Sequence, residues 1–486
     1  MLELTMKQLR EKLKKKEISV SELVEAQLRQ IEQYDGLYHA YNALNPEVRR
    51  RAEAVQAAID QGLDTPVAGI PIAVKDNIAT RDMPTTASSK ILEGFLSPYD
   101  ATVMQKLEAA GAVILGKTNM DEFAMGSTTE TSYTGISRNP WDTRKAPGGS
   151  SGGSAVAVAA DEAVAALGSD TGGSIRQPCA YCGITGMKPT YGRVSRYGLL
   201  AYGSSLDQIG PCAKSAEDCA GILEVISGYD EKDSTSLREP VPDFRQVMQQ
   251  DLQGKIIGLP MNYLGDGLNP QIKEAILAAA RQFETLGARV EEFTMPMIEY
   301  AVPAYYIIAS AEASSNLSRY DGIKYGYHPE QFEDLEDLYL TARSEGFGLE
   351  VKRRIMLGTF ALSSGYYDAY YQKALKVKAL IMDAFDQAFS RYDAILSPVA
   401  PNTAPKLGES LTDPLQMYLT DIYTVSVNLA GLPGLALPCG FDENGMPIGM
   451  QLLGQARAEA ILIQMGCAYQ RATDFHTQKP LLKEAE

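Results

Sequence analysis

The chain has 486 residues, and its 61 Asp and Glu residues outnumber its 45 Lys and Arg residues, which gives a formal net charge of -16. An acidic chain repels the phosphate backbone, because nucleic-acid affinity comes largely from Lys and Arg side chains that displace counterions. Charged residues at 22% and hydrophobic residues at 45% are typical of a globular chain and exclude a long disordered or fibrous protein. The composition therefore predicts a folded protein that leaves any nucleic acid to another chain.

No stretch of the sequence approaches the roughly 20 apolar residues of a membrane-spanning helix, and residues 1–10 lack the apolar core of a signal peptide. We therefore expect a cytoplasmic protein. Six cysteines are too few for a disulfide scaffold in a chain of this length. The single C-x-x-C pair has no second pair and no histidines in a zinc-binding pattern, so no metal is expected. We predict that Cys179 and Cys182 are buried thiols; the other four cysteines are Cys212, Cys219, Cys439 and Cys467.

The first sixty residues are predicted to be helical. Leu4, Leu9 and Leu13 lie on one loose stripe, and Ser19 with Glu22 has the pattern of a capping box that opens a helix over residues 20–34. Residues 1–60 would form an amphipathic collar. We expect this collar to belong to the same domain as the catalytic region, residues 61–486.

Short apolar runs closed by glycine follow the collar and predict strands that alternate with helices. A strand is predicted over residues 69–75, a helix over 101–110, and a strand over 112–115. Further strands are predicted at 163–167, 256–259, 288–293, 394–397, 435–438 and 447–453, and further helices at 271–286 and 458–471. This alternation indicates the α/β class, with a mixed, mostly buried sheet covered on both faces by helices. No linker rich in Pro, Gly and Ser divides the chain, so we expect one large domain.

Two glycine-serine turns within thirty residues are the most unusual feature of the sequence. They span residues 147–154 and 168–178, and the second follows the strand predicted at 163–167. Neither has the lysine of a phosphate-binding loop, so nucleotide binding by this chain has little support. Residues 149–153 match the letters of the G-x-S-x-G nucleophile elbow, but that motif needs a preceding strand, which is not predicted here. On composition alone, flexible surface turns are the simplest interpretation.

The position of the second turn favours a catalytic role instead. Proteins of the α/β class bind ligands at the carboxyl edge of the sheet, where Ser174 would lie. Two adjacent glycines allow backbone angles that are closed to other residues. Several backbone N–H groups could therefore converge on one point, as an oxyanion hole requires: those of Thr171, Gly172, Gly173 and Ser174.

A serine nucleophile needs a base. None of the three histidines, His39, His328 and His476, follows a predicted strand with a carboxylate partner, so each is expected to be structural. Lys75 ends a predicted buried strand, and burial can bring the pKa of a lysine from about 10.4 into the neutral range. Lys75 is therefore the candidate base. This segment alone fits an ordinary ion pair between Lys75 and Asp76 equally well.

Three motifs, at residues 69–77, 148–153 and 170–178, together resemble the amidase signature family. Further segments resemble the glutaminase subunits of tRNA-dependent amidotransferases within that family; they lie at residues 119–127, 309–322 and 350–355. The likeness spans most of the chain and implies the family's single large α/β domain. It also implies a Ser–cis-Ser–Lys triad, in which Ser174 is the acylated nucleophile, Ser150 the bridging serine and Lys75 the base.

The resemblance further implies a pocket for glutamine. Arg354 would hold the α-carboxylate of the substrate, Asp421 would hold its α-ammonium, and Tyr305 would line the site. A free amino acid needs one fixed charge for each of its own charges, which makes this set physically sensible. Without the resemblance, Arg354 would be assigned to the surface beside Arg353, and Asp421 to the exposed face of a helix.

The implied reaction begins when Ser174 attacks the side-chain amide of glutamine. It gives a γ-glutamyl ester and ammonia, and water then releases glutamate. The resemblance to the tRNA-dependent amidotransferases implies a heterotrimer. The expected partners are therefore the B and C subunits, and the B subunit would hold most of Glu-tRNA(Gln). One of these partners would use ATP and Mg²⁺ to form Gln-tRNA(Gln), or Asn-tRNA(Asn) from Asp-tRNA(Asn). No cofactor is expected in this chain.

Two alternatives remain open. A free-standing amidase acting on small amides would keep the triad without the partners, but a neutral amide would leave Arg354 and Asp421 unpaired. A non-catalytic protein could grip an anion through the backbone N–H groups of the glycine-serine turns. In that protein, the pattern of Lys75, Ser150 and Ser174 would have no purpose.

Overall fold

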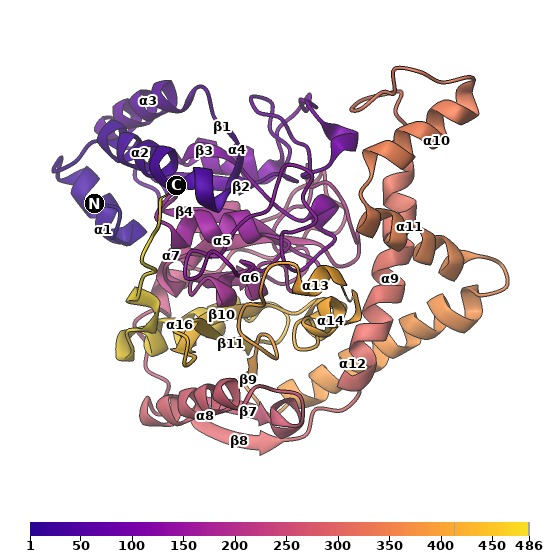
Figure 1. Ribbon diagram of the computed structural model, residues 1–486. Coiled ribbons are helices and arrows are strands. Elements are labelled where there is room, and N and C mark those ends of the chain that lie inside the picture. Colours follow the sequence, from indigo (N-terminus) through magenta and orange to yellow (C-terminus); the bar gives the residue numbers. More distant parts are fainter. Residues whose placement is uncertain (413, 485–486) are drawn as a thin grey trace.

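A mixed β-sheet runs through the middle of the computed structural model, which describes residues 1–412 and 414–484 (Figure 1). Eleven strands of this described part form the sheet, in the order β1-β3-β2-β4-β6-β5-β10-β11-β9-β7-β8. The strands are β1 Tyr41–Leu44, β2 Pro71–Lys75, β3 Val113–Thr118, β4 Ala165–Asp170, β5 Thr185–Lys188, β6 Gln208–Ala213, β7 Ile256–Pro260, β8 Arg289–Phe293, β9 Ala394–Pro398, β10 Gly434–Phe441 and β11 Pro447–Leu453.

The two ends of the sheet are mostly parallel and its middle is antiparallel. Strand β2 pairs in parallel with β3 and β4, and β7 pairs in parallel with β8 and β9. The strands between these groups pair antiparallel. The predicted α/β class with a mixed sheet is therefore confirmed.

Helices surround this sheet (Figure 1). The α-helices are α1 Met6–Lys14, α2 Val20–Tyr38, α3 Val48–Asp60, α4 Thr102–Ala109, α5 Gly152–Ala159, α6 Arg176–Tyr181, α7 Ala216–Ile226, α8 Pro270–Thr285, α9 Ala301–Asn316, α10 Leu335–Gly346, α11 Leu349–Leu362, α12 Lys373–Phe389, α13 Glu409–Thr412, α14 Pro414–Leu419, α15 Val425–Leu429 and α16 Glu459–Ala472. Shorter 3₁₀ helices are η1 Lys90–Leu92, η2 Glu122–Ala124, η3 Phe244–Gln246, η4 Met261–Leu264, η5 Ile298–Tyr300, η6 Leu317–Arg319 and η8 Phe475–Thr477, and η7 Tyr367–Gln372 is a π-helix.

Strand β2 shows why the sheet is buried on both faces. Ile72 and Val74 pack into a large apolar cluster on one face, together with residues of α7 and α16. Ala73, which points to the other face, packs into a second cluster with α2 and α5. Successive side chains of a strand point to opposite faces, so apolar residues at consecutive positions require cover on both.

The N-terminal collar contains helices α1, α2 and α3 (Figure 1). The predicted capping box is confirmed, because Ser19 accepts from the backbone of Glu22 and the Glu22 side chain accepts from the backbone of Ser19. The expectation of a purely helical collar is wrong at one place: residues Tyr41–Leu44 form β1, which pairs antiparallel with β3. Strand β1 forms through backbone hydrogen bonds to β3, which is distant in the sequence, so the local pattern of residues gives no sign of this pairing. The C-terminal segment also lies against the collar, since Lys483 N–H donates to Tyr38 Oη at 2.8 Å.

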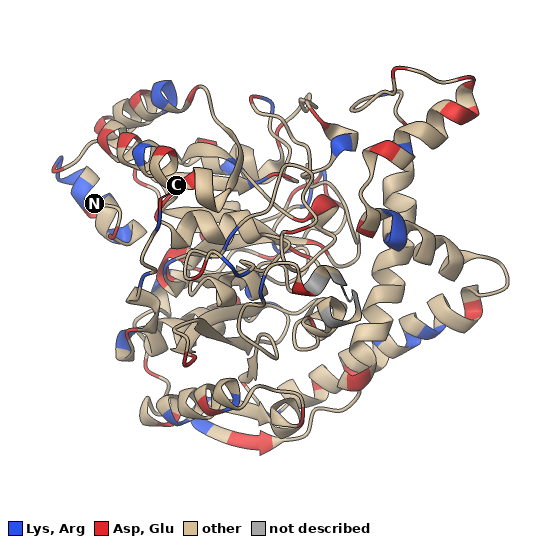
Figure 2. Cartoon of the chain, in the orientation of Figure 1, with Lys and Arg blue, Asp and Glu red and all other residues tan. Residues whose placement is uncertain are grey.

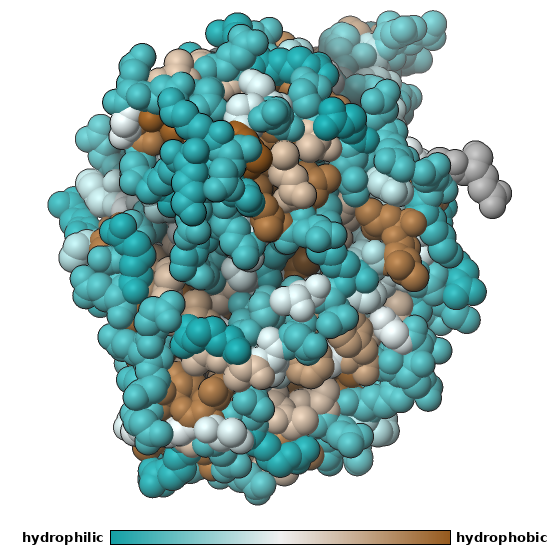
Figure 3. All heavy atoms as spheres, turned by 90° about the vertical axis from the view of Figure 1, so that its left-hand side faces the viewer, coloured by the Kyte–Doolittle hydropathy of each residue, from teal (hydrophilic) through white to brown (hydrophobic). Residues whose placement is uncertain are grey.

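Charged residues occur mainly in the outer helices and loops, while the central strands are largely uncharged (Figure 2). The face at the left of Figure 1 is mostly hydrophilic, with apolar areas between the polar side chains (Figure 3). Within residues 1–412 and 414–484, no helix combines the length and the apolar character needed to cross a membrane. All six cysteines are buried free thiols, including Cys179 and Cys182, for which this was predicted.

Candidate active site

Lys75 lies at the end of β2 and is completely buried. Its Nζ is 2.8 Å from Ser150 Oγ, 2.8 Å from Ser151 Oγ and 3.2 Å from the Ser169 carbonyl oxygen. Ser150 follows a cis peptide bond from Gly149 and stands two residues before α5. The fold therefore brings Lys75 into direct hydrogen-bond contact with the serine that the family pattern pairs with it.

The alternative ion pair between Lys75 and Asp76 is not formed. Asp76 Oδ1 lies 3.4 Å from the Nζ of another buried lysine, Lys117, which comes from the neighbouring strand β3. Asp76 directly follows β2, and its carboxylate lies beside Lys117, whereas Lys75 contacts the glycine-serine turns.

Burial lowers the pKa of Lys75 to about 7, and the nearby Asp121 carboxylate opposes this effect. A charged ammonium is costly to hold away from water, which is why desolvation favours the neutral amine. Near pH 7 a substantial fraction of Lys75 is therefore neutral and can accept a proton.

The second glycine-serine turn leads from the end of β4 into α6. Ser174 is 8% exposed, and its carbonyl oxygen accepts from the backbone N–H of Ser151 at 3.1 Å. The two turns thus lie against each other through Ser151 and Ser174. Within the described residues the Ser174 hydroxyl makes no hydrogen bond, including none to Ser150 Oγ.

One of the four N–H groups predicted for the oxyanion hole is already occupied. The N–H of Gly173 donates to Asp170 Oδ1 at 2.8 Å. The N–H groups of Thr171, Gly172 and Ser174 have no acceptor within residues 1–412 and 414–484. The structure therefore leaves three N–H groups of this turn available and removes Gly173 from the predicted set, because the Asp170 carboxylate caps the turn.

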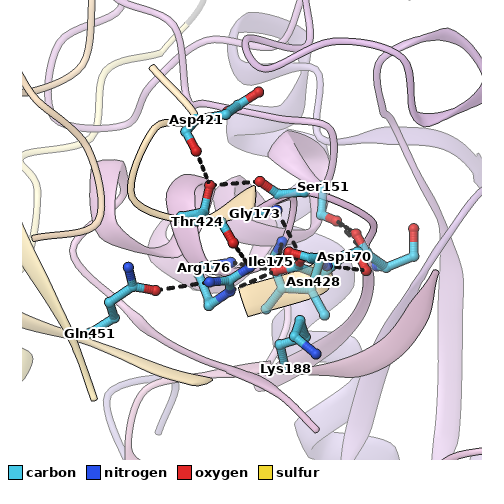
Figure 4. Close-up of polar contacts among 12 residues, drawn as sticks. Ser151, Asp170, Gly173, Ile175, Arg176, Lys188, Asp421, Thr424, Asn428 and Gln451 are labelled. Atoms are coloured by element: carbon cyan, nitrogen blue, oxygen red, sulfur yellow. Dashed lines mark hydrogen bonds and ion pairs between the residues drawn. The ribbon is translucent and has the colours of Figure 1, made fainter. Parts of the chain in front are cut away.

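A buried ion pair stabilises the same turn (Figure 4). Arg176 and Asp170 are both completely buried, with Nε to Oδ2 at 3.1 Å and Nη2 to Oδ1 at 3.2 Å. Despite its burial, the pKa of Asp170 is held well below its usual range by the Arg176 guanidinium. The remaining donors of Arg176 reach Gln451 Oε1, Asn428 Oδ1 and the Thr424 carbonyl oxygen.

Arg354 is buried, contrary to the surface position that the sequence alone would assign. It lies on α11 and is 2% exposed. Its Nη1 donates to Tyr202 Oη at 2.7 Å, and its Nε donates to Glu350 Oε1 at 2.8 Å. The guanidinium also lies over the rings of Tyr202, Tyr306 and Tyr418, 5.2 to 5.5 Å from their centroids. Aromatic faces attract a cation in a desolvated site.

Asp421 is also buried and lies in the turn before α15, not on a helix face. Its carboxylate accepts from Tyr306 Oη at 2.9 Å and from Ser127 Oγ at 3.0 Å. Burial raises the pKa of Asp421 to about 7. Tyr306 thus contacts both Arg354 and Asp421, so the two opposite charges lie in one pocket.

Tyr305 joins this pocket to the nucleophile turn. It is buried on α9, and a Cβ atom added to Gly172 would lie only 2.5 Å from its Cζ and Oη atoms. Only glycine permits the ring to approach the turn this closely. The three predicted pocket residues therefore lie together, next to the turn that carries Ser174.

Several residues of the site were not predicted. Ser151 belongs to the same glycine-serine run as Ser150, and Glu350 precedes Arg354 by one helical turn, so local patterns could have indicated both. Ser127 and Tyr202 reach the pocket from remote loops, and no local pattern points to them. The three histidines have no contact with these groups: His39 ends α2, His328 Nδ1 contacts the Gly322 carbonyl, and His476 lies in η8.

Within residues 1–412 and 414–484, no group of three or more His, Cys, Asp or Glu residues could hold a metal ion. The fold and the Lys–Ser–Ser arrangement define an enzyme class, and residues 22–463 match the model of the Amidase family. The chain belongs to this family.

Individual relatives show which proteins of this family the chain resembles. The chain is 58% identical over 477 residues to the A subunit of glutamyl-tRNA(Gln) amidotransferase from Agathobacter rectalis, covering 98% of this chain and 95% of that protein. The crystal structure of the corresponding A subunit from Thermotoga maritima matches with a TM-score of 0.82 and 41% identity, over 100% and 99% of the two chains. A peptide amidase from Stenotrophomonas maltophilia matches with a TM-score of 0.81 and 30% identity, over 96% of each chain.

Proposed function

We propose that this chain is the glutamine-hydrolysing subunit of a tRNA-dependent amidotransferase. The observation that carries the proposal is the pair of buried opposite charges, Arg354 and Asp421, both in contact with Tyr306 beside the nucleophile turn. Arg354 would bind the α-carboxylate of glutamine and Asp421 its α-ammonium, while Tyr305 lines the pocket. A neutral amide would offer no charged group to either side chain, whereas glutamine offers one to each. The name shared by the relatives of 52–58% identity supports the same function.

The proposed chemistry uses Lys75, Ser150 and Ser174 in sequence. Neutral Lys75 accepts a proton from Ser150, which accepts one from Ser174 as Ser174 Oγ attacks the side-chain carbonyl carbon of glutamine. The free N–H groups of Thr171, Gly172 and Ser174 would stabilise the negative charge on the carbonyl oxygen. The C–N bond breaks as the proton returns through Ser150 to the leaving nitrogen. Ammonia and a γ-glutamyl ester result, and water then releases glutamate.

The proposed function assigns the remaining steps to other chains. Ammonia would pass to the B and C subunits of the amidotransferase, where Glu-tRNA(Gln) is converted to Gln-tRNA(Gln) with ATP and Mg²⁺, or Asp-tRNA(Asn) to Asn-tRNA(Asn). The net charge of -16 agrees with a chain that does not itself hold the tRNA. These reactions belong in the cytoplasm and require no cofactor in this chain.

Ammonia release from L-glutamine tests the proposal. The protein would be purified together with its partner chains and compared on glutamine and propionamide, with Ser174→Ala as the blank. We expect rapid turnover of glutamine, little turnover of propionamide and no activity in the blank. Retained ammonia release in Ser174→Ala would contradict the assigned nucleophile. Equal turnover of the two amides would instead support a free-standing amidase.

Arg354→Gln is expected to raise the KM for glutamine roughly 10- to 100-fold, because a hydrogen bond to a charged group contributes about 1.5–3 kcal/mol. The kcat value should change less, since the α-carboxylate is bound equally in the ground and transition states. Arg353→Gln is the matched control: its side chain is about 35% exposed and pairs with the same Glu350, so this variant shows what the loss of an arginine beside Glu350 does by itself. Steady-state kinetics of both variants checks this prediction. An equal rise in KM for both variants would place the carboxylate site elsewhere.

A further inference from the structure

The peptide group between Gly172 and Gly173 is held at both ends. Its carbonyl oxygen, on Gly172, accepts from Thr424 Oγ1 at 2.6 Å. Its N–H, on Gly173, donates to Asp170 Oδ1 at 2.8 Å. Thr424 reaches this peptide from a segment remote in the sequence, whereas Asp170 is the last residue of β4, at the start of the same turn (Figure 4).

This peptide group needs such restraint more than most. Both of its residues are glycines, which adopt many backbone conformations, and Gly173 has a φ of +130°. Rotation of the peptide plane would exchange the places of its carbonyl oxygen and its N–H. A carbonyl oxygen turned toward the reacting amide would repel the negative charge that develops there, so the orientation of this plane affects catalysis.

Thr424 is itself firmly placed. Its backbone N–H donates to the Asp421 carbonyl oxygen at 3.0 Å, and its own carbonyl oxygen accepts from Arg176 Nη2 at 3.1 Å. A Cβ atom on Gly173 would lie 2.4 Å from Thr424 Oγ1 and 2.7 Å from Thr424 Cβ, so the two residues are in direct contact. The segment that carries the pocket residue Asp421 is thereby joined to the nucleophile turn.

We propose that Thr424 is a positioning residue for the oxyanion hole: its hydroxyl fixes the Gly172–Gly173 peptide so that the neighbouring N–H groups of Gly172 and Ser174 stay directed at the reacting carbonyl oxygen. This inference deepens the proposed function and rests on it. It also places the geometry of the nucleophile turn under the control of the Asp421 segment, which is remote from that turn in the sequence.

Thr424→Val removes the hydroxyl and nearly keeps the volume, and Thr424→Ser keeps the hydroxyl. Thr420→Val is a matched control. Thr420 lies one turn before Thr424, and within the described residues its hydroxyl bonds the Met417 carbonyl oxygen and no other group. Two rates would be measured: glutamine hydrolysis, and covalent labelling of Ser174 by a fluorophosphonate. The labelling reaction requires the nucleophile and the oxyanion hole but no glutamine pocket.

Loss of one oxyanion-hole donor lowers kcat by about 10²–10³-fold, and a misoriented peptide loses part of that. For Thr424→Val we therefore expect kcat to fall roughly 10- to 100-fold, labelling to slow by a similar factor, and the KM for glutamine to change less than about threefold. Thr424→Ser and Thr420→Val should stay within about threefold of the wild type in all three quantities.

Three results would overturn the inference: an unchanged labelling rate in Thr424→Val, a fall in kcat matched by an equal rise in KM, or the same loss in Thr424→Ser. If Thr424→Val does not fold, Thr424→Ala replaces it in the same comparison. Failure of the proposed function has a different signature, in which the wild type is labelled at Ser174 but does not hydrolyse glutamine. The labelling rates then still decide the role of Thr424.

Discussion

Lys75→Met is expected to lower kcat for glutamine hydrolysis by about 10²–10⁴-fold, the usual contribution of a positioned general base. Met has no group that can accept the proton from Ser150, whose Oγ lies 2.8 Å from Lys75 Nζ. Met also suits the apolar stem of a buried lysine, so the variant should fold. The measurement is steady-state ammonia release at about pH 8, which lies above the pKa of Lys75. The melting temperature of the variant checks that it folds.

The pH dependence of kcat, measured with saturating glutamine, should report the same group, because the bound α-ammonium then keeps Asp421, whose pKa is also about 7 in the free site, in its charged form. Lys75 must be neutral to act as a base, and burial lowers its pKa to about 7. Activity should therefore be constant above about pH 8 and fall about tenfold per pH unit below about pH 6. A profile that stays flat down to about pH 5 would exclude Lys75 as the titrating base.

Lys188→Met provides the matched control for this profile. Lys188 is also buried, and burial lowers its pKa to about 7, but its Nζ donates to the Pro189 carbonyl oxygen and contacts neither turn serine. We expect Lys188→Met to keep the acid limb near pH 7. Disappearance of the limb in this variant would assign it to Lys188.

Arg176→Met is expected to lower the free energy of unfolding by about 3–5 kcal/mol, because it leaves the Asp170 carboxylate buried without its counterion. Both side chains are fully buried, and Arg176 also satisfies Gln451 and Asn428. Urea denaturation measures the change. Adding Asp170→Asn to Arg176→Met should restore part of the loss, since it removes the uncompensated charge.

Arg49→Met is the control for the loss of an ion pair as such. Arg49 Nε contacts Glu25 Oε1 at 2.6 Å, but the arginine side chain is 67% exposed. Exposed pairs contribute about 0–1 kcal/mol. If Arg176→Met costs no more than Arg49→Met, the buried pair does not stabilise the nucleophile turn as we describe.

The stability that Asp170 contributes depends on pH. The pKa of Asp170 is lowered in the folded state, so its contribution to the free energy of unfolding is complete above about pH 4 and is lost at lower pH.

The elements that were predicted correctly are those whose signal is local. Ile72 and Val74 alternate with Ala73 along β2, and Ser19 with Glu22 caps α2; both patterns extend over a few residues and depend on backbone geometry alone. Strands β5 and β6 went unpredicted, since their glycine, proline and lysine residues are poor strand formers. Their partners in the middle of the sheet supply the hydrogen bonds that their own composition does not favour.

The same distinction holds for the site. The glycine-serine turns and a lysine at a strand end are properties of the chain as written. Together with the order and spacing of the three motifs they indicated the family that the chain resembles, and that resemblance implied the reaction. Sequence spacing constrains contacts only within a few residues, because a flexible chain can bring any distant segments together. Only the tertiary structure therefore shows that Lys75 contacts Ser150, which is 75 residues away in the sequence, and not its neighbour Asp76. Tertiary packing also buries Arg354 among tyrosines and places Thr424 against Gly172, which is 252 residues away in the sequence. Both contacts depend on how α9, α11 and the segment before α15 pack around the end of β4.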